Sequence, residues 1–383
     1  MSYNYLGVNL GTSSIKLVEL ANNKGTPKLT TYGFTEQSID IIKDDSELAR
    51  GEAVRILKRL CKEAGVNTTK AITALPTFSV FSSVISLPKM SKKDLAGAVK
   101  WEAKKIIPMP IEDVILDWHI LNKEENLKMP GKIKNFFGRI DSKDKNSQEG
   151  SDLQKKENNK EKNKDIKILL TGAPKNLVSK YIDIFTRAGL NLLSLETEIF
   201  SLVRSLVGND KSTLMIVDIG AMSTNISLIQ NGVAIVNRSI GFGGKNISNE
   251  ISQNLDVDFN RAEQFKFDIG INAGGQQDSS VFKTVENTII PIVDEIKYTI
   301  DFFKNQLNFG AGQGNSNIEK IILTGGSSMM SYLPEYLSKQ LNIKVYIGDP
   351  WARVVYPQEL KSIFEEIGPK LAVSVGLAMR EIE

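Results

Sequence analysis

The chain has 383 residues, an apolar fraction of 41%, a charged fraction of 24% and a formal net charge of +3. This length accommodates two or more domains, the composition is that of a globular protein, and the small charge gives no argument for nucleic-acid binding. The single cysteine, Cys61, and the single histidine, His119, exclude an intramolecular disulfide framework, a cysteine metal cluster and a Ser-His-Asp site.

The N-terminus does not resemble a signal peptide, because Asn9 and Gly11 interrupt its apolar run. No stretch reaches the roughly 18 uncharged apolar residues of a membrane span. We therefore expect a cytoplasmic protein that meets a membrane only indirectly.

A β-hairpin is predicted at the N-terminus, with strands over residues 3–10 and 14–20. Its turn combines a glycine with hydroxyl side chains and presents backbone N–H groups, which suits a phosphate. Lys16 lies on the second strand, and strand alternation leaves open whether it faces a phosphate or solvent. The candidate binding residues of this turn are Asn9, Gly11, Thr12, Ser13, Ser14 and Lys16.

The rest of residues 1–76 has an α/β pattern. A strand over 29–34 is followed by a helix over 45–64 with apolar residues at helical spacing, and then by a short buried strand over 71–76.

Residues 77–124 predict a small inserted α+β subdomain, although a larger first domain is the simpler alternative. A strand over 78–87 ends at Pro88, Ser91 is a good N-cap for a helix that stops before Pro108, and a further strand covers 114–121.

Residues 125–165 mix lysines, acids and polar residues and carry few large apolar side chains. Such a segment does not bury enough surface to offset its ordering entropy, so we expect disorder. Its basic and aromatic piece over 133–140 is either an amphipathic anchor or the edge of this loop.

Order is expected to return with a strand over 166–171, a helix over 176–188, a strand over 192–195 and a helix over 196–206. Glu196 and Glu198 fall at the start of that last helix, where acids are favoured by the helix dipole in any case.

A second hairpin follows over residues 214–228, in the same order as the first: an apolar run, an acid at Asp218, a glycine, hydroxyl residues and an alternating strand. Asp218 adds a carboxylate that suits Mg²⁺ beside a phosphate. Because the two hairpins lie some two hundred residues apart, we expect two related lobes that clamp one ligand. The candidate residues here are Asp218, Gly220, Ser223 and Thr224.

A strand over 233–240 then leads through Gly243, Gly244 and Lys245 into a helix over 246–255, whose N-terminus also favours phosphate. Glu263 and Lys266 share one face of the next helix, which by itself indicates only a surface ion pair. A glycine-rich bridge over 270–280, a long helix over 281–308 broken or kinked at Pro291, and a loop over 310–317 follow.

The third element is a buried strand over 321–324 that ends in a glycine pair. Paired glycines let a backbone approach a flat ring or a sugar. Its candidate residues are Gly325, Gly326, Ser327 and Met329. A helix over 333–341, a strand over 345–347 and a closing helix over 370–381 complete the chain.

Two phosphate hairpins and a glycine-pair turn in this order resemble the actin-like ATPase superfamily, which includes sugar kinases and the division protein FtsA. More narrowly, the chain resembles the PilM family of type IV pilus assembly. Four stretches carry this likeness: residues 7–20, 86–91, 101–113 and 195–204.

The resemblance implies an actin-like (ribonuclease H-like) α/β fold of two lobes with a small FtsA-type insert. The expected parts are residues 1–76 with 166–207 as the first lobe, 77–124 as the insert, 125–165 as a disordered insertion, and 208–383 as the second lobe with a helical subdomain over about 243–310.

The resemblance also implies ATP and Mg²⁺ as cofactors. Asp218 and Glu196 would be catalytic, and Glu263, Lys266 and Lys245 would contact ribose and adenine. Asp218 would hold the metal, with Asn9 acting through water. Because Asn9 stands where the superfamily usually has aspartate, we expect ATP binding with at most slow hydrolysis.

The expected function is docking of the cytoplasmic tail of a PilN-like inner-membrane protein, together with other pilus proteins, at the inner face of the membrane. Self-association is left open. One alternative is an FtsA-like division or filament protein, which is disfavoured because no amphipathic tail follows the last helix. The other is a slow ATPase of the sugar-kinase superfamily, for which this sequence offers no strong candidate for the catalytic base.

Overall fold

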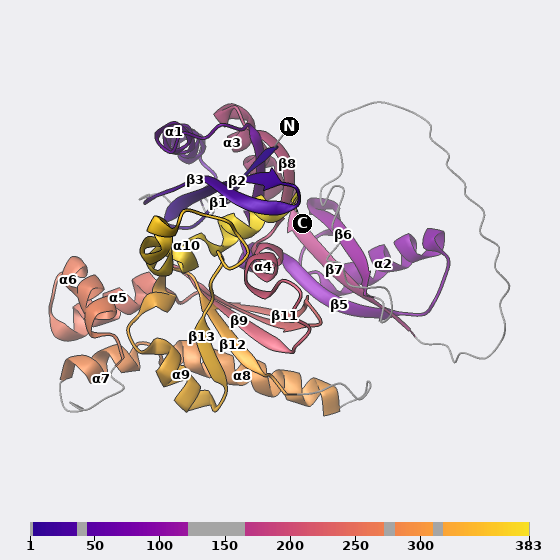
Figure 1. Ribbon diagram of the computed structural model, residues 1–383. Helices are drawn as coiled ribbons and strands as arrows, with labels where there is room; N and C mark the ends of the chain where they lie inside the picture. The colour runs from indigo at the N-terminus through magenta and orange to yellow at the C-terminus, as the bar shows by residue number, and fades with distance from the viewer. Residues whose placement is uncertain (1–2, 37–43, 122–164, 272–279, 309–316, 383) are drawn as a thin grey trace.

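The computed structural model describes residues 3–36, 44–121, 165–271, 280–308 and 317–382. Two five-stranded sheets form its frame (Figure 1). The first contains β1 (Asn4–Leu10), β2 (Ser14–Asn23), β3 (Thr26–Glu36), β4 (Lys70–Leu75) and β8 (Asn191–Thr197). The second contains β9 (Leu214–Ile219), β10 (Thr224–Gln230), β11 (Val233–Ile240), β12 (Lys320–Thr324) and β13 (Lys344–Ile347).

The two sheets repeat one topology. Their orders are β3-β2-β1-β4-β8 and β11-β10-β9-β12-β13. In each sheet three consecutive strands pair antiparallel, and two further strands extend the sheet in parallel from the first of them. In the sequence only the two hairpins look alike. The parallel strands of the two sheets are both buried, but their residues are not similar. We call each sheet with its outer helices a lobe.

Helices cover the outer face of each sheet with separate apolar cores. On the first lobe these are α1 (Glu47–Glu63) and α3 (Lys175–Ala188), and α3 ends at Gly189 in the left-handed conformation. The second lobe carries α5 (Gly244–Leu255), α6 (Phe259–Gln264), α7 (Ser280–Asn287), α8 (Ile290–Asn308) and α9 (Leu333–Leu341). The break between α7 and α8 falls just before Pro291, as the sequence predicts.

Two helices, α4 (Glu198–Leu202) and α10 (Lys361–Met379), lie between the sheets (Figure 1). Apolar residues of β4, β9, β12, α4 and α10 form one buried cluster there. Glycines permit the close packing of α10: a Cβ on Gly7 of β1 would lie 2.1 Å from the Ser374 carbonyl oxygen, and one on Gly376 would lie 1.9 Å from that of Ser201. On the other side, the Pro369 carbonyl of α10 accepts the Gly325 N–H of the second lobe at 3.1 Å. The backbone of α10 therefore contacts both lobes.

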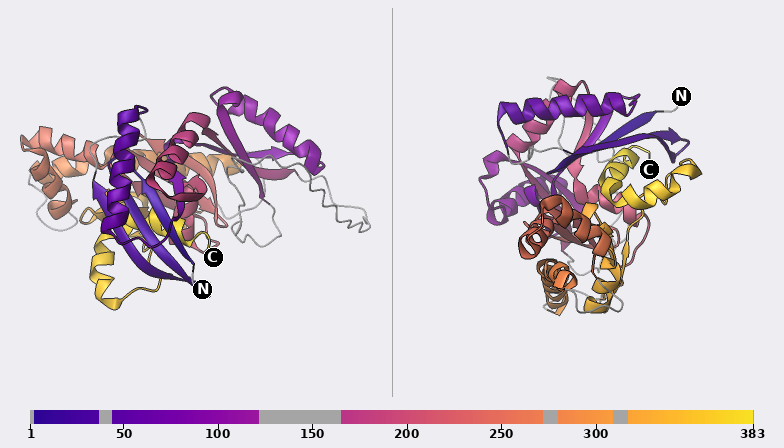
Figure 2. Two further views of the ribbon diagram at one scale, coloured as in Figure 1. Left: turned by 90° about the horizontal axis from the view of Figure 1, so that it is seen from above. Right: turned by 90° about the vertical axis from the view of Figure 1, so that its left-hand side faces the viewer.

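A third, three-stranded sheet has the order β5-β7-β6, with β5 (Phe81–Leu87), β6 (Val114–Leu121) and β7 (Ile166–Pro174). Helix α2 (Lys92–Ile106) packs on it, and the Ser91 hydroxyl accepts the Asp94 N–H at 3.3 Å as the expected cap. Figure 2 shows this unit at the opposite end of the molecule from α5 and α6.

Three assignments differ from the sequence analysis. Strand β7, assigned there to the first lobe, is the central strand of the small sheet because it pairs with both β5 and β6. Glu196 lies within strand β8 rather than at the start of a helix, since β8 continues its parallel pairing with β4 to Thr197. Helix α10 begins at Lys361 and contains Pro369, so it is longer than predicted.

The predictions for residues 125–165, including the piece over 133–140, fall outside the described residues except for Asp165. Most of the bridge over 270–280 and of the loop over 310–317 is likewise not described. No helix in the described ranges is long and apolar enough to cross a membrane.

The contact between α10 and α4 predicts a large effect of Gly376→Ala. The added Cβ would meet the Ser201 carbonyl, so α10 would have to move, and the free energy of unfolding should fall by about 1–3 kcal/mol in urea denaturation. Gly97→Ala in α2 is the control, because no atom lies within 4 Å of a Cβ there and alanine favours a helix. Equal effects of the two substitutions would contradict the close packing.

Candidate functional site

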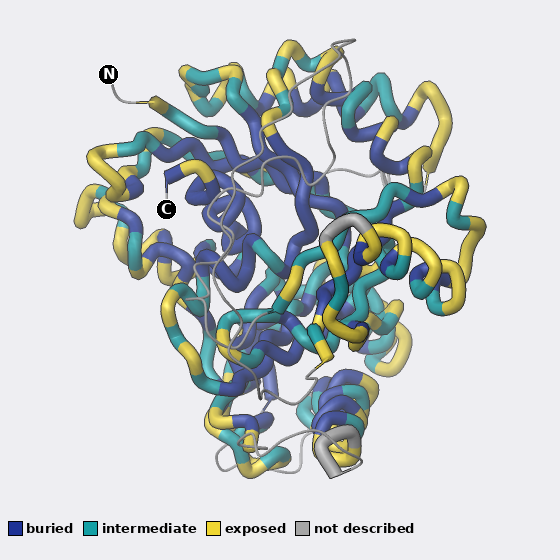
Figure 3. Tube along the Cα trace, turned by 90° about the vertical axis from the view of Figure 1, so that its right-hand side faces the viewer, coloured by how far each residue is buried: buried dark blue, intermediate teal, exposed yellow. Residues whose placement is uncertain are grey.

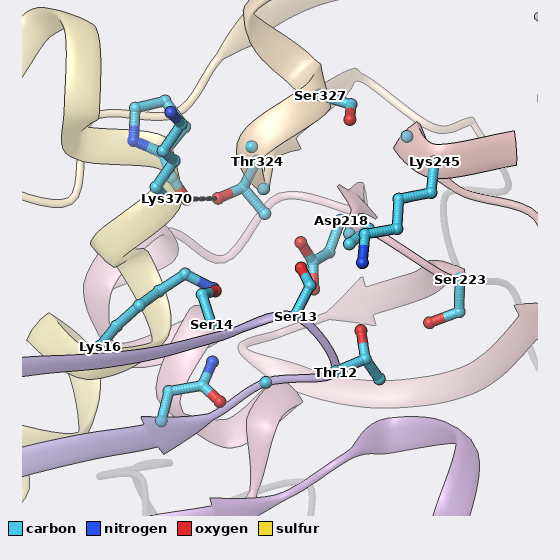
Figure 4. A pocket seen from close by; sticks show the side chains of 18 of the residues that line it. Thr12, Ser13, Ser14, Lys16, Asp218, Ser223, Lys245, Thr324, Ser327 and Lys370 are labelled. Carbon is cyan, nitrogen blue, oxygen red and sulfur yellow. Dashed lines mark hydrogen bonds between the residues drawn. The ribbon is translucent and has the colours of Figure 1, made fainter. Parts of the chain in front are cut away.

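A cavity of about 380 Å³ lies where the two hairpin turns face each other. Both lobes contribute to it, through the two turns, the loop after β12, the starts of α5 and α6, and α10 (Figure 4). Sixteen of the predicted residues line it: Asn9, Gly11, Thr12, Ser13, Ser14, Lys16, Asp218, Gly220, Ser223, Gly244, Lys245, Glu263, Lys266, Gly325, Gly326 and Ser327.

The two turns have the same backbone geometry. The Gly11 N–H donates to the Ser14 carbonyl at 2.9 Å in the first, and the Gly220 N–H donates to the Ser223 carbonyl at 3.0 Å in the second. Each turn follows a polar residue at or near the end of a buried strand, Asn9 on β1 and Asp218 on β9. The repeated pattern therefore brings two equivalent turns to one cavity.

Lys16 points into the cavity, which decides the alternative that the sequence leaves open. It pairs in register with Asn9 on β1 and with Phe34 on β3, and all three residues line the cavity. The Asn9 Oδ1 atom is buried and finds no hydrogen-bond partner among the described residues. Asn9 thus lines the cavity and carries a buried acceptor oxygen without a donor in the described part of the chain.

Two carboxylates face Lys16. Burial raises the pKa of Asp218, an effect that Lys16 and a hydrogen bond from Asn225 partly offset. Burial and the neighbouring Asp218 raise the pKa of Glu198 to about 7, although its carboxylate accepts the Thr77 N–H at 3.0 Å. Burial also lowers the pKa of Lys16, and both acids oppose that shift. Three buried charges therefore depend on one another across the lobes.

The glycine pair comes within contact distance of Asp218. Gly325 has φ of 85°, and a Cβ there would lie 2.4 Å from Asp218 Oδ1. A side chain at this position would therefore block the carboxylate as well as strain the backbone. Met329 from the same loop does not line the cavity.

Helix α5 begins against the second turn. The Gly244 N–H donates to the Gly220 carbonyl and the Lys245 N–H to the Ala221 carbonyl, both at 2.8 Å. Figure 4 shows the Lys245 side chain reaching toward Asp218 and Ser13. Gly243 packs against this turn, where a Cβ would lie 2.7 Å from the Gly220 oxygen, but it does not line the cavity.

The pair Glu263–Lys266 is more than a surface ion pair. Lys266 is 2% exposed, and its Nζ donates to Glu263 Oε1 at 2.6 Å and to Ser248 Oγ at 2.9 Å. Burial lowers the pKa of Lys266, while Glu263 acts in the opposite direction. Both side chains line the cavity on the second-lobe side.

Besides Gly243 and Met329, two further predicted residues do not line the cavity. Glu196 is fully buried and does not line the cavity; its carboxylate accepts from Arg204 at 2.8 and 3.1 Å and lies 3.4 Å from Arg380 Nε. Glu196, predicted to be catalytic, therefore lies away from the cavity, and Glu198 is the acid of this segment that lines it. Thr224 is also buried, and its hydroxyl donates to the Phe242 carbonyl at 2.8 Å.

Sequence reasoning missed several lining residues. Lys370 of α10 lies near the glycine pair and acts electrostatically on both Lys16 and Lys266. Strand register could have indicated Phe34, which is paired with Lys16, but no local pattern marks Lys370. The other missed residues that line the cavity are Glu36, Pro76, Phe78, Ala221, Asn225, Phe259, Asn260, Phe267, Thr324, Pro369 and Val373.

The site can hold a polyanion together with a divalent cation. Four lysines and two glycine-containing turns supply positive charge and N–H groups, while Asp218 and Glu198 supply carboxylates. Among the described residues there is no group of three or more His, Cys, Asp or Glu that could hold a metal. A cation here would therefore depend on water and on the anion itself for its remaining ligands.

Comparison with protein-family models matches residues 7–135 and 151–382 to the family described as type IV pilus assembly protein PilM. Among curated proteins, the cell division protein FtsA of Agrobacterium fabrum is 25% identical over 181 residues, which are 42% of this chain and 38% of that protein. The chain thus spans less than half the length of the curated relatives that it matches.

Among solved structures, a PilM–PilN type IV pilus biogenesis complex matches with a TM-score of 0.77 and 23% identity, over 99% of this chain and 98% of that chain. A double helical filament of MamK matches with a TM-score of 0.51 and 13% identity, over 98% of each chain. The fold is therefore actin-like, as the sequence predicts.

The raised pKa of Glu198 predicts a pH-dependent stability. A free glutamate titrates near 4.5 and Glu198 near 7, so the folded state binds the extra proton between these values and its stability falls as pH rises through that window. Glu198→Gln abolishes this titration. As pH rises through this window, urea denaturation should show the free energy of unfolding of the variant increasing relative to that of the wild type, by up to roughly 3 kcal/mol.

Glu63→Gln, at an exposed position of α1, is the matched control. If the difference between Glu198→Gln and the wild type does not change with pH, the carboxylate is not buried as described.

Proposed function

The chain belongs to the PilM family of type IV pilus assembly proteins, and on that basis we propose that it is an ATP-binding assembly protein that docks the cytoplasmic tail of a PilN-like inner-membrane protein. The observation that carries the nucleotide part is the pair of equivalent turns facing each other across one cavity, with a buried acid and four lysines around them. Such a cavity is of a size and polarity that suit a small charged ligand.

The phosphates would lie between the turns at residues 11–14 and 220–223, which line the cavity together with Lys16. The Mg²⁺ ion would lie beside Asp218, with Asn9 accepting from a metal-bound water. The unpartnered Asn9 Oδ1 fits this role, because a buried acceptor is costly without a donor. ATP supplies a phosphoanhydride whose charge the lysines and the metal would balance.

The adenosine would lie toward the second lobe. Gly325 and Gly326 leave the backbone open to a ring or a sugar, and Ser327 adds a hydroxyl. Glu263 and Lys266 are held by Ser248 on the other side of this space, so they are oriented before any ligand arrives. We assign them contacts to ribose and adenine.

The proposed role is geometric rather than catalytic. Asn9 supplies no charge, and Glu198, with its pKa raised to about 7, is only partly ionised near neutral pH. The site therefore offers less negative charge to Mg²⁺ than two ionised acids would. We propose that bound ATP sets the arrangement of the lobes and is hydrolysed slowly at most.

The tail would bind near residues 83–91 and α2, between the first lobe and the small sheet. The likeness to a PilM–PilN complex over nearly the whole chain supports this choice of partner. The protein would then be cytoplasmic and held at the inner face of the membrane through its partners, among other pilus proteins, with no nucleic acid involved.

Calorimetric titration of the purified chain with ATP and ADP in the presence of Mg²⁺ tests the nucleotide site. We expect binding of both, and a loss of roughly tenfold or more in ATP affinity on Lys16→Met, because an ammonium that faces the phosphates is removed. Lys28→Met, at an exposed position of β3, should leave the affinity unchanged. Should the wild type bind neither nucleotide, the proposal fails.

A steady-state assay of ATP hydrolysis distinguishes an assembly protein from an enzyme with rapid turnover. We expect slow release of phosphate, reduced further in Asp218→Ala. Rapid hydrolysis that depends on Asp218 would overturn the geometric role and make the protein an enzyme.

Titration with a synthetic PilN-like tail peptide tests the partner. We expect saturable binding, which a scrambled peptide does not show. Ser86→Trp should weaken it, since Ser86 is exposed on β5 and a large ring there would occupy the proposed binding region; Thr30→Trp, at an exposed position of β3, is the control. An unchanged affinity in Ser86→Trp would place the tail elsewhere, and no binding at all would remove the partner.

A further inference from the structure

The outer face of α2 carries an exposed tryptophan among lysines. The inner face of the helix, with Leu95, Val99 and Ala103, is buried against the small sheet. Trp101 on the opposite side is 63% exposed, and Met109, just beyond the end of the helix, is 40% exposed. We call Lys100, Trp101, Lys104, Lys105 and Met109 the basic face of α2.

The charges of this face are mostly unneutralised. Lys105 pairs with Glu102 at 2.8 Å, and its Nζ lies 3.3 Å from the centre of the Trp101 ring. Lys100 and Lys104 are exposed and form no salt bridge within the described residues. Lysines in the last turn of a helix are also stabilised by the helix dipole. That accounts for Lys104 and Lys105 but leaves Lys100 and the exposure of Trp101 unexplained.

The position of the face suits a broad, flat partner. Figures 1 and 2 place α2 at an extremity of the molecule, away from the lobes. Figure 3, viewed from the side of the small sheet, shows exposed residues along this helix. The face is the convex side of a single helix and not a groove, so it favours an extended surface over a peptide.

We propose that the basic face of α2 is a direct contact surface for an anionic lipid bilayer. Indole rings are favoured at the boundary between headgroups and acyl chains, and lysine stems can extend over apolar surface while their ammonium groups reach lipid phosphates. With one ring and three lysines, the contact is weak and reversible. It goes beyond the proposed function, in which the membrane is reached only through a partner.

Co-sedimentation of the full chain with vesicles tests the proposal. The vesicles are phosphatidylcholine alone, or equal parts of phosphatidylcholine and phosphatidylglycerol. We expect binding to the second only, reduced roughly tenfold or more in the double variant K100E/K104E. The control is K58E/K62E on α1, which makes the same charge change at two exposed lysines four residues apart. Binding should weaken with added salt.

The ring is tested separately. Trp101→Ser should lose vesicle binding, whereas Trp101→Phe should retain most of it. In the wild type, anionic vesicles should shift the tryptophan emission to the blue. Trp101→Phe should lose most of this shift, because Trp351 is buried and Trp118 packs partly buried against the core of the small sheet.

Absence of vesicle binding by the wild type, or equal losses in K100E/K104E and K58E/K62E, overturns the proposal. Binding to polyglutamate without binding to anionic vesicles also overturns it and assigns the face to an acidic polypeptide. Peptide titration and vesicle co-sedimentation of Ser86→Trp on β5 separate this inference from the proposed function. Weakened peptide binding with unchanged vesicle binding supports a distinct lipid surface, and vesicle binding lost together with peptide binding overturns it.

Discussion

The electrostatic interaction among Lys16, Asp218 and Glu198 is the constraint on which the rest of the structure depends. Each of these charges is costly to bury alone, and each becomes acceptable only beside the others. Lys16 belongs to the first sheet and Asp218 to the second, so neither lobe is electrostatically complete by itself. The two lobes must therefore meet in one arrangement, and α10 packs against both: Gly7 of β1 allows its close approach to the first sheet, and its Pro369 carbonyl accepts the Gly325 N–H of the second lobe.

The same arrangement links the cavity to the small sheet. The Glu198 carboxylate accepts from Thr77, the residue that opens the segment leading into β5. A change in the charge of Glu198 would therefore act directly on the backbone that supports the small sheet. In the proposed function, this contact would connect the ligand site to the region that binds the partner.

Local sequence patterns predicted the parts of the site that depend on the backbone. Turns such as those at Gly11 and Gly220 require particular residues, so they can be recognised without knowing the fold, and so can the glycine pair at Gly325. Side chains that reach the cavity from distant elements could not be found in this way. Lys370 comes from a helix whose pattern shows only packing, and Glu196 was misplaced because two further residues of strand pairing turn it toward Arg204 and away from the cavity.

The sequence by itself determined the two hairpins, the caps and breaks of the helices, and the family resemblance, because each depends on residues close together in the chain. Only the tertiary structure decided that Lys16 faces inward, that β7 completes the small sheet, and that Glu198 rather than Glu196 lines the cavity. These outcomes depend on which strands pair and how helices pack against them. Such contacts join residues far apart in the chain, and no local pattern of charge or hydrophobicity encodes them.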